Sequence, residues 1–247
     1  GNKKNTTVRL HHCCNGIKVN SILKAGISQT DIIKARDGNV IDQFNLLFNS
    51  PFSIAHRSEL KNIYKLSRRK YEMSNWGDFA FYDLAIAAEQ RISTKELAYL
   101  NPRDSSEKGY INSFNHITAQ AIITSCFSEK IADFIADVHE LYNMPELISG
   151  HFTEKQLSDV DKNPVDNYVD MVNNEWGQEI GKKLKSKYSI NQNTIWTPTL
   201  LANYLNELQS YYSWAFHIGM NPFRVDDKII IKFSKKINAA LNNTIKY

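Results

Sequence analysis

The sequence NSFNHITAQAIITSCF, residues 112–127, decides the fold class of this protein. Its apolar residues lie almost all round a helix, rather than along one stripe. A helix with that distribution is normally enclosed by other elements, because no face of it is suited to water. We therefore expect this segment to be the central, buried helix of an all-α domain, with its neighbours in the chain packed around it.

The next two segments have the patterns of helices that cover a central one. Ser128-Glu129 begins a helix that Met144-Pro145 ends, and Pro164 suits the first turn of a longer helix that runs to about Tyr188. The short connection at Ser128 predicts that the first two helices are antiparallel. The apolar stripe of the long helix comprises Val165, Val169, Val172, Trp176, Ile180, Leu184 and Tyr188. This spacing predicts that Trp176 belongs to the core.

Helical signals also dominate on both sides of these segments. They are a stripe from Leu60 to Leu66, the run Phe79–Glu89, a capping box at Ser93-x-x-Glu96, and an aromatic-rich helix from Thr197-Pro198 to Gly219. The run Ile229–Ile231 fits a short strand or the start of a last helix, and the sequence leaves both open.

The first 50 residues have a different pattern, with turn signals such as Asn15-Gly16 and only one short helix, Ile41–Phe48. We expect a loop-rich N-terminal arm over residues 1–50 and a compact multi-helix domain over residues 51–247. The cluster His11-His12-Cys13-Cys14 fits either a metal site or a mobile N-terminal segment, because adjacent ligands converge poorly on one ion. The three cysteines of the chain imply no disulfide framework.

Composition excludes several classes of protein. The 247 residues are 42% hydrophobic and 23% charged, as in an ordinary globular chain. The net charge of +4 is spread over short basic runs, which makes a nucleic-acid partner unlikely. No apolar run is long enough for a transmembrane segment. The sequence begins at Gly1 without Met, so removal of a signal peptide upstream, and with it export, stays open.

Polar residues recur at helical spacing on each of the three central segments. His116 shares a helix face with Asn112, and Asp137, His139 and Glu140 end the following helix. The long helix carries a polar face that ends in two glycines, formed by Asp166, Asp170, Asn173, Asn174, Gly177 and Gly181. Glycines inside a helix destabilise it by about 1 kcal/mol each relative to alanine, so they indicate close approach of another backbone or of a ligand.

Two interpretations follow from these polar faces. In the first, they converge on a pocket with His116, Glu140 and Asp170 as catalytic residues and with a divalent cation as the candidate cofactor. The remaining residues of that pocket would be Asp137, His139, Asn173, Asn174 and Gly177. In the second, the histidine and the carboxylates form a structural hydrogen-bond network, and the glycines admit a neighbouring helix.

Three segments, NSFNH at 112–116, ADVHE at 136–140 and VDMVNNEWG at 169–177, resemble the motifs of an uncharacterised family of helical bacterial domains. That family has an Asp-Ala-Phe-Arg-His helix, an Asp-Ala-His-Glu helix end and a Met-Asp-Leu-His-Asn-Asn-x-x-Gly helix, often in secreted or toxin-like proteins. The resemblance covers residues 112–181. It implies functional roles for His116, Asp137, His139, Glu140, Asp170, Asn173, Asn174 and Gly177. The chain departs from the family at Asn112, Asn115 and Val172, where the family has Asp, Arg and His.

Two functions are consistent with these observations. The first is a bacterial secreted or envelope-associated effector-type hydrolase, acting on an envelope substrate, with Glu140 or His116 as general base and carboxylates that hold a divalent ion or orient water. The second is a binding or assembly module with a protein partner, in which the polar centre is structural. In that module, exposed aromatic residues such as Tyr211, Tyr212 and Trp214 would contact the partner.

Overall fold

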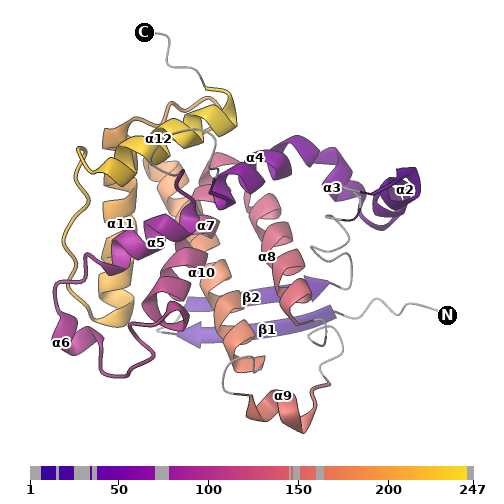
Figure 1. Ribbon diagram of the computed structural model, residues 1–247, viewed down its shortest axis with the longest axis horizontal. Helices are drawn as coiled ribbons and strands as arrows, with labels where there is room; N and C mark the ends of the chain where they lie inside the picture. The colour runs from indigo at the N-terminus through magenta and orange to yellow at the C-terminus, as the bar shows by residue number, and fades with distance from the viewer. Residues whose placement is uncertain are drawn as a thin grey trace.

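The computed structural model describes residues 7–14, 17–24, 34, 38–69, 78–144, 146, 151–159 and 164–243. Helices form the body of the molecule, as the sequence predicts, and a two-stranded hairpin lies along one side of it (Figure 1). None of the helices described is long and apolar enough to cross a membrane. The helices are α2 (Val40–Asn49), α3 (Pro51–Ala55), α4 (Arg57–Ser67), α5 (Phe81–Glu89), α6 (Lys95–Ala98), η2 (Glu107–Ile111), α7 (Asn112–Cys126), α8 (Glu129–Asn143), α9 (Glu154–Ser158), α10 (Pro164–Lys187), α11 (Pro198–Phe216) and α12 (Lys228–Leu241).

The hairpin corrects the prediction of a loop-rich N-terminal arm. Strands β1 (Thr7–Cys14) and β2 (Ile17–Lys24) pair antiparallel, with Cys14 opposite Ile17. Apolar residues alternate along both strands, and the dipeptide between them, Asn15-Gly16, is the most typical connection of a two-residue hairpin. Those signals outweigh the turn-rich composition of the segment. The other prediction for the arm, a short helix near residues 41–48, is confirmed by α2.

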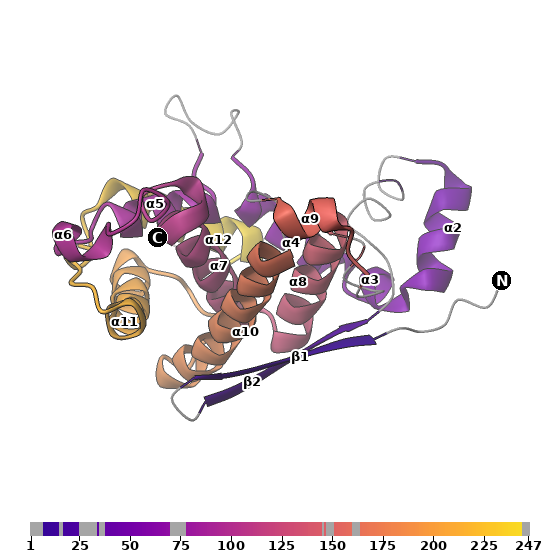
Figure 2. The same ribbon diagram turned by 90° about the horizontal axis from the view of Figure 1, so that it is seen from below.

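The hairpin lies against the helices that carry the polar residues. Figure 2 shows it running beneath α10 and α8, and β2 packs against α10. Residues His11–Cys14 belong to the extended strand β1. Their side chains lie outside the described part of the structure, so a metal site there stays a prediction.

Helix boundaries follow the capping signals with two exceptions, one of which is that α11 ends at Phe216, with His217 in the left-handed conformation, and not at Gly219. The Ser128 hydroxyl accepts a hydrogen bond from the Ile131 amide at 3.2 Å and so begins α8, and Thr197 caps α11 in the same way. The predicted capping box at Ser93 is wrong, because α6 begins after Thr94 and lacks a side-chain cap. The Thr94 hydroxyl accepts instead from the Gly219 amide at 2.8 Å, which ties α6 to the end of α11. Residues Ile229–Ile231 lie in α12 and are helical.

Helix α7 is the central helix that its sequence predicts. Ten of its fifteen residues are buried, among them Phe114, Ile117 and Ile122. It packs against α5, α8 and α10, and the connection to α8 at Phe127-Ser128 is short. The three helices that carry His116, Glu140 and Asp170 are therefore mutual neighbours, as predicted.

The long helix α10 buries a different face from the one expected. Its apolar stripe is buried only in its C-terminal half, at Ile180 and Leu184, whereas Val169 is 43% exposed. Trp176 is half-buried and stacks on Trp214, which is 49% exposed, so the prediction that it belongs to the core is wrong. The face that turns inward carries polar residues and glycine: Asn167, Asp170, Asn173, Asn174, Gly177, Gln178 and Gly181.

Two rows of contacts explain why a polar face can be buried here. In the first row, Asn112, His116 and Gln120 of α7 hydrogen-bond to Asp170, Asn174 and Gln178 of α10. Both sets advance by four residues in the same direction, so the two helices are parallel and each polar group finds a partner one turn above the last.

The second row brings the two backbones together. Ser113 accepts a hydrogen bond from Asn173 at 3.4 Å. One and two turns further along the same face of α10 lie Gly177 and Gly181. A Cβ on Gly177 would lie 2.6 Å from the Ile117 carbonyl oxygen, and one on Gly181 would lie 2.6 Å from that of Ala121. The glycines therefore permit the close approach that the sequence indicated, and the neighbour is another helix.

We expect Gly177→Ala and Gly181→Ala each to lower the free energy of unfolding by up to ~2 kcal/mol. Overpacking costs about 1–3 kcal/mol, while alanine improves helix propensity by about 1 kcal/mol, and the first term wins because the obstructing atoms are backbone. Ser186→Ala, at an exposed position on the same helix, is the control and should be neutral or stabilising. Urea denaturation measures all three, and a more stable Gly177→Ala protein would contradict the close approach.

The aromatic residues of α11 are more buried than a partner-binding surface requires. Tyr212, expected to be exposed, is 2% exposed; it stacks on Phe114 and hydrogen-bonds to Thr118 at 2.6 Å. Tyr211 is half-buried, and only Trp214 of the three is exposed. The correction follows from helix geometry, because Tyr212 continues the inward stripe of Tyr204, Leu205 and Leu208.

Candidate metal centre

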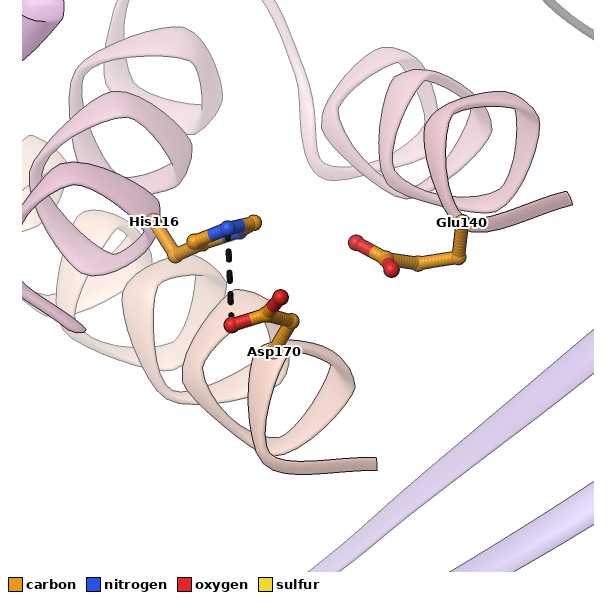
Figure 3. A group of neighbouring side chains, drawn as sticks. All are labelled: His116, Glu140 and Asp170. Carbon is orange, nitrogen blue, oxygen red and sulfur yellow. Dashed lines mark ion pairs between the residues drawn. The ribbon is translucent and has the colours of Figure 1, made fainter. Parts of the chain in front are cut away.

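Three helices place one histidine and two carboxylates around a common point. His116 lies near the start of α7, Glu140 in the last turn of α8, and Asp170 in the second turn of α10. Figure 3 shows the three side chains pointing toward one another from these helices. One ligand atom of each lies within 4.8 Å of the others. Among the residues described, this is the one group of three such side chains close enough to hold a metal ion.

Both ring nitrogens of His116 face residues of α10. Its Nδ1 lies 2.9 Å from Asn174 Oδ1, and its Nε2 lies 3.5 Å from Asp170 Oδ1. The side chain is 12% exposed, so little water reaches it. Because an amide oxygen only accepts, Nδ1 carries a proton and donates to Asn174. The Nε2 atom is therefore the nitrogen that faces the carboxylates.

Asp170 is held by α7 at the same point. Its Oδ1 accepts a hydrogen bond from Asn112 Nδ2 at 2.7 Å. Burial raises the pKa of Asp170, whereas His116 and the hydrogen bond from Asn112 act against that rise. Asn112 is a site residue that the sequence reading did not include. Its signal was present, because Asn112 lies one helical turn before His116.

Glu140 is the most deeply buried of the three, at 1% exposed. Its Oε1 accepts from Asn174 Nδ2 at 3.2 Å, and its Oε2 has no hydrogen-bond partner among the residues described. Burial, followed by the negative charge of Asp170, raises the pKa of Glu140 to about 8. A buried carboxylate with one unpartnered oxygen is costly unless a proton or a cation neutralises it.

Two further predicted residues lie beside the cluster. Asp137 is half-buried one turn before Glu140, and its charge contributes to the raised pKa of that residue. His139 is exposed at the rim, where its Nε2 lies 3.2 Å from Asn143 Nδ2 and its ring centroid 6.3 Å from that of His116. Desolvation by nearby protein atoms, with the positive charges of His116 and Arg68, lowers the pKa of His139 to about 4. Its ring is therefore neutral at pH 7.

The other predicted residues divide between the centre and the helix contact. Asn174 bridges His116 and Glu140 and belongs to the centre. Asn173 and Gly177 lie in the second row of contacts with α7, where Asn173 bonds Ser113 and Gly177 meets the Ile117 backbone. Their contacts in the structure are therefore those of helix packing, and they are not with the three clustered side chains.

No protein-family model, no curated protein and no solved structure matches the chain. The resemblance to a helical bacterial family therefore stays a prediction that rests on residues 112–181 alone.

The donor set fits a divalent cation. One imidazole nitrogen and two carboxylates suit ions such as Mn²⁺, Fe²⁺ and Zn²⁺, and the two carboxylates also suit Mg²⁺. The His116 ring donates its other N–H to Asn174, an arrangement common for metal-bound histidine. Without an ion, the same groups could act in acid–base chemistry, because a carboxyl with a pKa of about 8 is protonated at neutral pH.

Proposed function

We propose that the protein is a hydrolase that acts through a divalent cation bound by His116, Glu140 and Asp170. The observation that carries the proposal is the convergence of these three ligand groups, two of them buried and His116 partly buried, within 4.8 Å of one another. They come from three separate helices, so the arrangement is a product of the tertiary fold. The secreted or envelope-associated setting inferred from the sequence stays a prediction.

The unpartnered oxygen of Glu140 supports this proposal over a purely structural network. Buried side-chain oxygens usually have a hydrogen-bond partner, because desolvation without one costs about 1–3 kcal/mol or more. Here Glu140 Oε2 has none among the residues described, although Asn174 lies against the other oxygen of the same carboxylate. A cation coordinated by Oε2 would satisfy that oxygen.

The chemistry expected of such a centre is hydrolysis. Three protein ligands leave positions open, and a divalent cation held in this way polarises a substrate oxygen and lowers the pKa of bound water. The protein residues orient the ligand groups and limit access by water, since His116 and Asp170 side chains are each 12% exposed. His139 lies at the rim of the cluster, where the lowered pKa of its ring disfavours a role as proton acceptor at neutral pH.

One observation favours the alternative, a binding or assembly module with a structural polar centre. The bridge formed by Asn174 and the hydrogen bond from Asn112 to Asp170 continue the row that Gln120 and Gln178 form one turn further on. The contact between Gln120 and Gln178 joins α7 to α10 without any carboxylate. In this case the whole row would serve helix packing alone, and no cation would be bound.

A titration of the chelator-treated protein with Mn²⁺, Zn²⁺ and Mg²⁺ tests the proposal. We expect one cation equivalent to bind and to raise the thermal midpoint, because a ligand at 100 times its Kd stabilises the folded state by about 2.7 kcal/mol. His116→Ala and Asp170→Asn should lose this response. Asp226→Asn, whose carboxylate side chain is 68% exposed outside the cluster, is the control and should keep it.

Hydrolysis is then measured on chromogenic esters, amides and phosphoesters with and without the cation. Cation-dependent turnover that His116→Ala removes is the expected result. Full turnover after chelation would indicate acid–base chemistry by the same residues. Absence of both cation binding and turnover would favour the structural interpretation.

A further inference from the structure

We propose that Asn174 is the positioning residue of this centre: it selects Nε2 of His116 as the ligating nitrogen and directs Oε2 of Glu140 to the same point. The inference rests on the proposed function, because it concerns how the cation is held. Asn174 hydrogen-bonds to two of the three ligand side chains, and these bonds occupy both polar ends of its amide group.

The position of Asn174 makes it a bridge between two helices. It lies on α10 one turn after Asp170, and it is 3% exposed. Its Oδ1 lies 2.9 Å from His116 Nδ1 on α7, and its Nδ2 lies 3.2 Å from Glu140 Oε1 on α8. A single amide group thus contacts ligands from both neighbouring helices.

The two ends of the amide have opposite hydrogen-bonding character, and this fixes the ligands. The NH₂ group can only donate, so it faces the acceptor oxygen of Glu140, and the carbonyl oxygen can only accept, so it faces an N–H of His116. The N–H of Nδ1 therefore points to Asn174, and Nε2 is the ring nitrogen that faces Asp170 Oδ1, 3.5 Å away. A second hydrogen bond of this kind is how proteins usually orient metal-bound imidazole.

The same contact accounts for the free oxygen of Glu140. Asn174 holds Oε1, so the rotation of the carboxylate is fixed and Oε2 is left as the atom without a partner among the described residues. Asn174 thereby determines which atom of two ligands faces the centre: Nε2 of His116 and Oε2 of Glu140. Asn112 donates a hydrogen bond to Asp170 in the same way, and within the described part of the chain it has no hydrogen bond to the other two ligands.

A helix-packing role alone predicts a different behaviour from Asn174, and the chain offers a control. Gln178 lies one turn further along α10, is 2% exposed and hydrogen-bonds to Gln120 of α7 at 3.3 Å. It joins α10 to α7, as Asn174 does, but among the described residues it has no hydrogen bond to α8 or to any of the three ligands. Asn174→Leu and Gln178→Leu therefore each remove a buried amide that hydrogen-bonds to α7, and only the first removes hydrogen bonds to the ligands of the centre.

The first measurement is the ¹⁵N NMR spectrum of the His116 ring in the wild-type protein without added cation. We expect Nδ1 to carry a proton and, after Mg²⁺ or Zn²⁺ is added, the Nε2 resonance to shift. A ring without a proton on Nδ1 overturns the inference. This measurement needs no variant and no activity, so it is independent of whether Asn174→Leu folds.

The second measurement is calorimetric titration with Zn²⁺ of wild type, Asn174→Leu and Gln178→Leu. Loss of a group that orients a ligand typically lowers cation affinity 10- to 100-fold, so we expect that loss for Asn174→Leu and less than a threefold change for Gln178→Leu. Equal affinities of Asn174→Leu and wild type overturn the inference but leave the proposed function intact. If wild type binds no cation, the proposed function fails, and with it the role of Asn174 in holding the ion.

Discussion

Glu140→Gln is expected to abolish cation binding and hydrolysis while it makes the protein more stable at pH 7. The amide has the shape of the carboxyl group and can still accept from Asn174, but it lacks the charge that a cation requires. The affinity loss should exceed the 10- to 100-fold that accompanies loss of an outer hydrogen bond to a ligand. A gain of stability with a loss of function distinguishes a functional carboxylate from one that serves the fold.

The gain of stability follows from the raised pKa of Glu140. In the unfolded chain this carboxyl has its ordinary value of 4.5, whereas in the folded protein it holds its proton until about pH 8. Between these two values unfolding releases a proton, so the stability of wild type falls as the pH rises, by about 1.4 kcal/mol per pH unit. At pH 7 the ionisable side chain therefore destabilises the cation-free protein by on the order of 3 kcal/mol relative to glutamine.

The measurement is urea denaturation of both proteins without cation at pH 5, 7 and 8.5. We expect the difference in the free energy of unfolding to grow from pH 5 to pH 8.5 and then to level off. Glu179→Gln, at an exposed carboxylate of α10, is the control and should show no such growth. If Glu140→Gln unfolds the protein, or if function survives it, these residues are structural and the hydrolase proposal is wrong.

Trp196→Ala is expected to cost ~3–5 kcal/mol of stability, and Trp176→Ala only about 1–2 kcal/mol. Trp196 is fully buried, packs edge-on against Tyr204 at a centroid distance of 5.3 Å, and has its backbone held by the Asn238 amide. Its removal leaves a large cavity. Trp176 is half-buried and stacks on the exposed Trp214 at a centroid distance of 6.1 Å, so less packing is lost.

The midpoints of urea denaturation of the two variants check this difference. Wild type and Tyr211→Phe, a mild change at a half-buried aromatic residue, provide the reference values. A larger loss for Trp176→Ala than for Trp196→Ala would contradict the orientation of α10 described above.

The sequence predicted the helices and the meeting of three polar faces because those features are local or nearly so. The apolar distribution of residues 112–127, the cap at Ser128 and the proline at 164 each act within a few residues, and the structure has α7, α8 and α10 at those places. Helical spacing also placed His116, Glu140 and Asp170 on faces that could converge. The structure brings these three residues together.

The errors arose where tertiary contacts override local pattern. The apolar stripe through Trp176 suggested the buried face of α10, but Gly177 and Gly181 allow α7 to approach a different face, and the polar residues there find partners on α7 and α8. Hydrophobic periodicity does not reveal that the polar residues of α10 have hydrogen-bond partners on α7, because those partners lie 58 positions away in the sequence. The hairpin differs from the prediction for another reason: Asn15-Gly16 is a turn signal by itself and predicts a hairpin only together with the alternating residues on either side.

Gly177 and Gly181, in the second row of contacts, also determine the register of α7 along α10. Both rows of contacts repeat every four residues, so a shift by one helical turn would still set polar residues opposite polar residues. The same shift would drive Asn173 or Lys185 into the backbone of α7, because Gly177 and Gly181 would no longer lie opposite Ile117 and Ala121. The two glycines thus exclude the alternative registers of α7 on α10, because only the observed register places a residue without a side chain opposite Ile117 and Ala121. The alignment of the ligand atoms around the centre therefore depends on two positions that have no side chain.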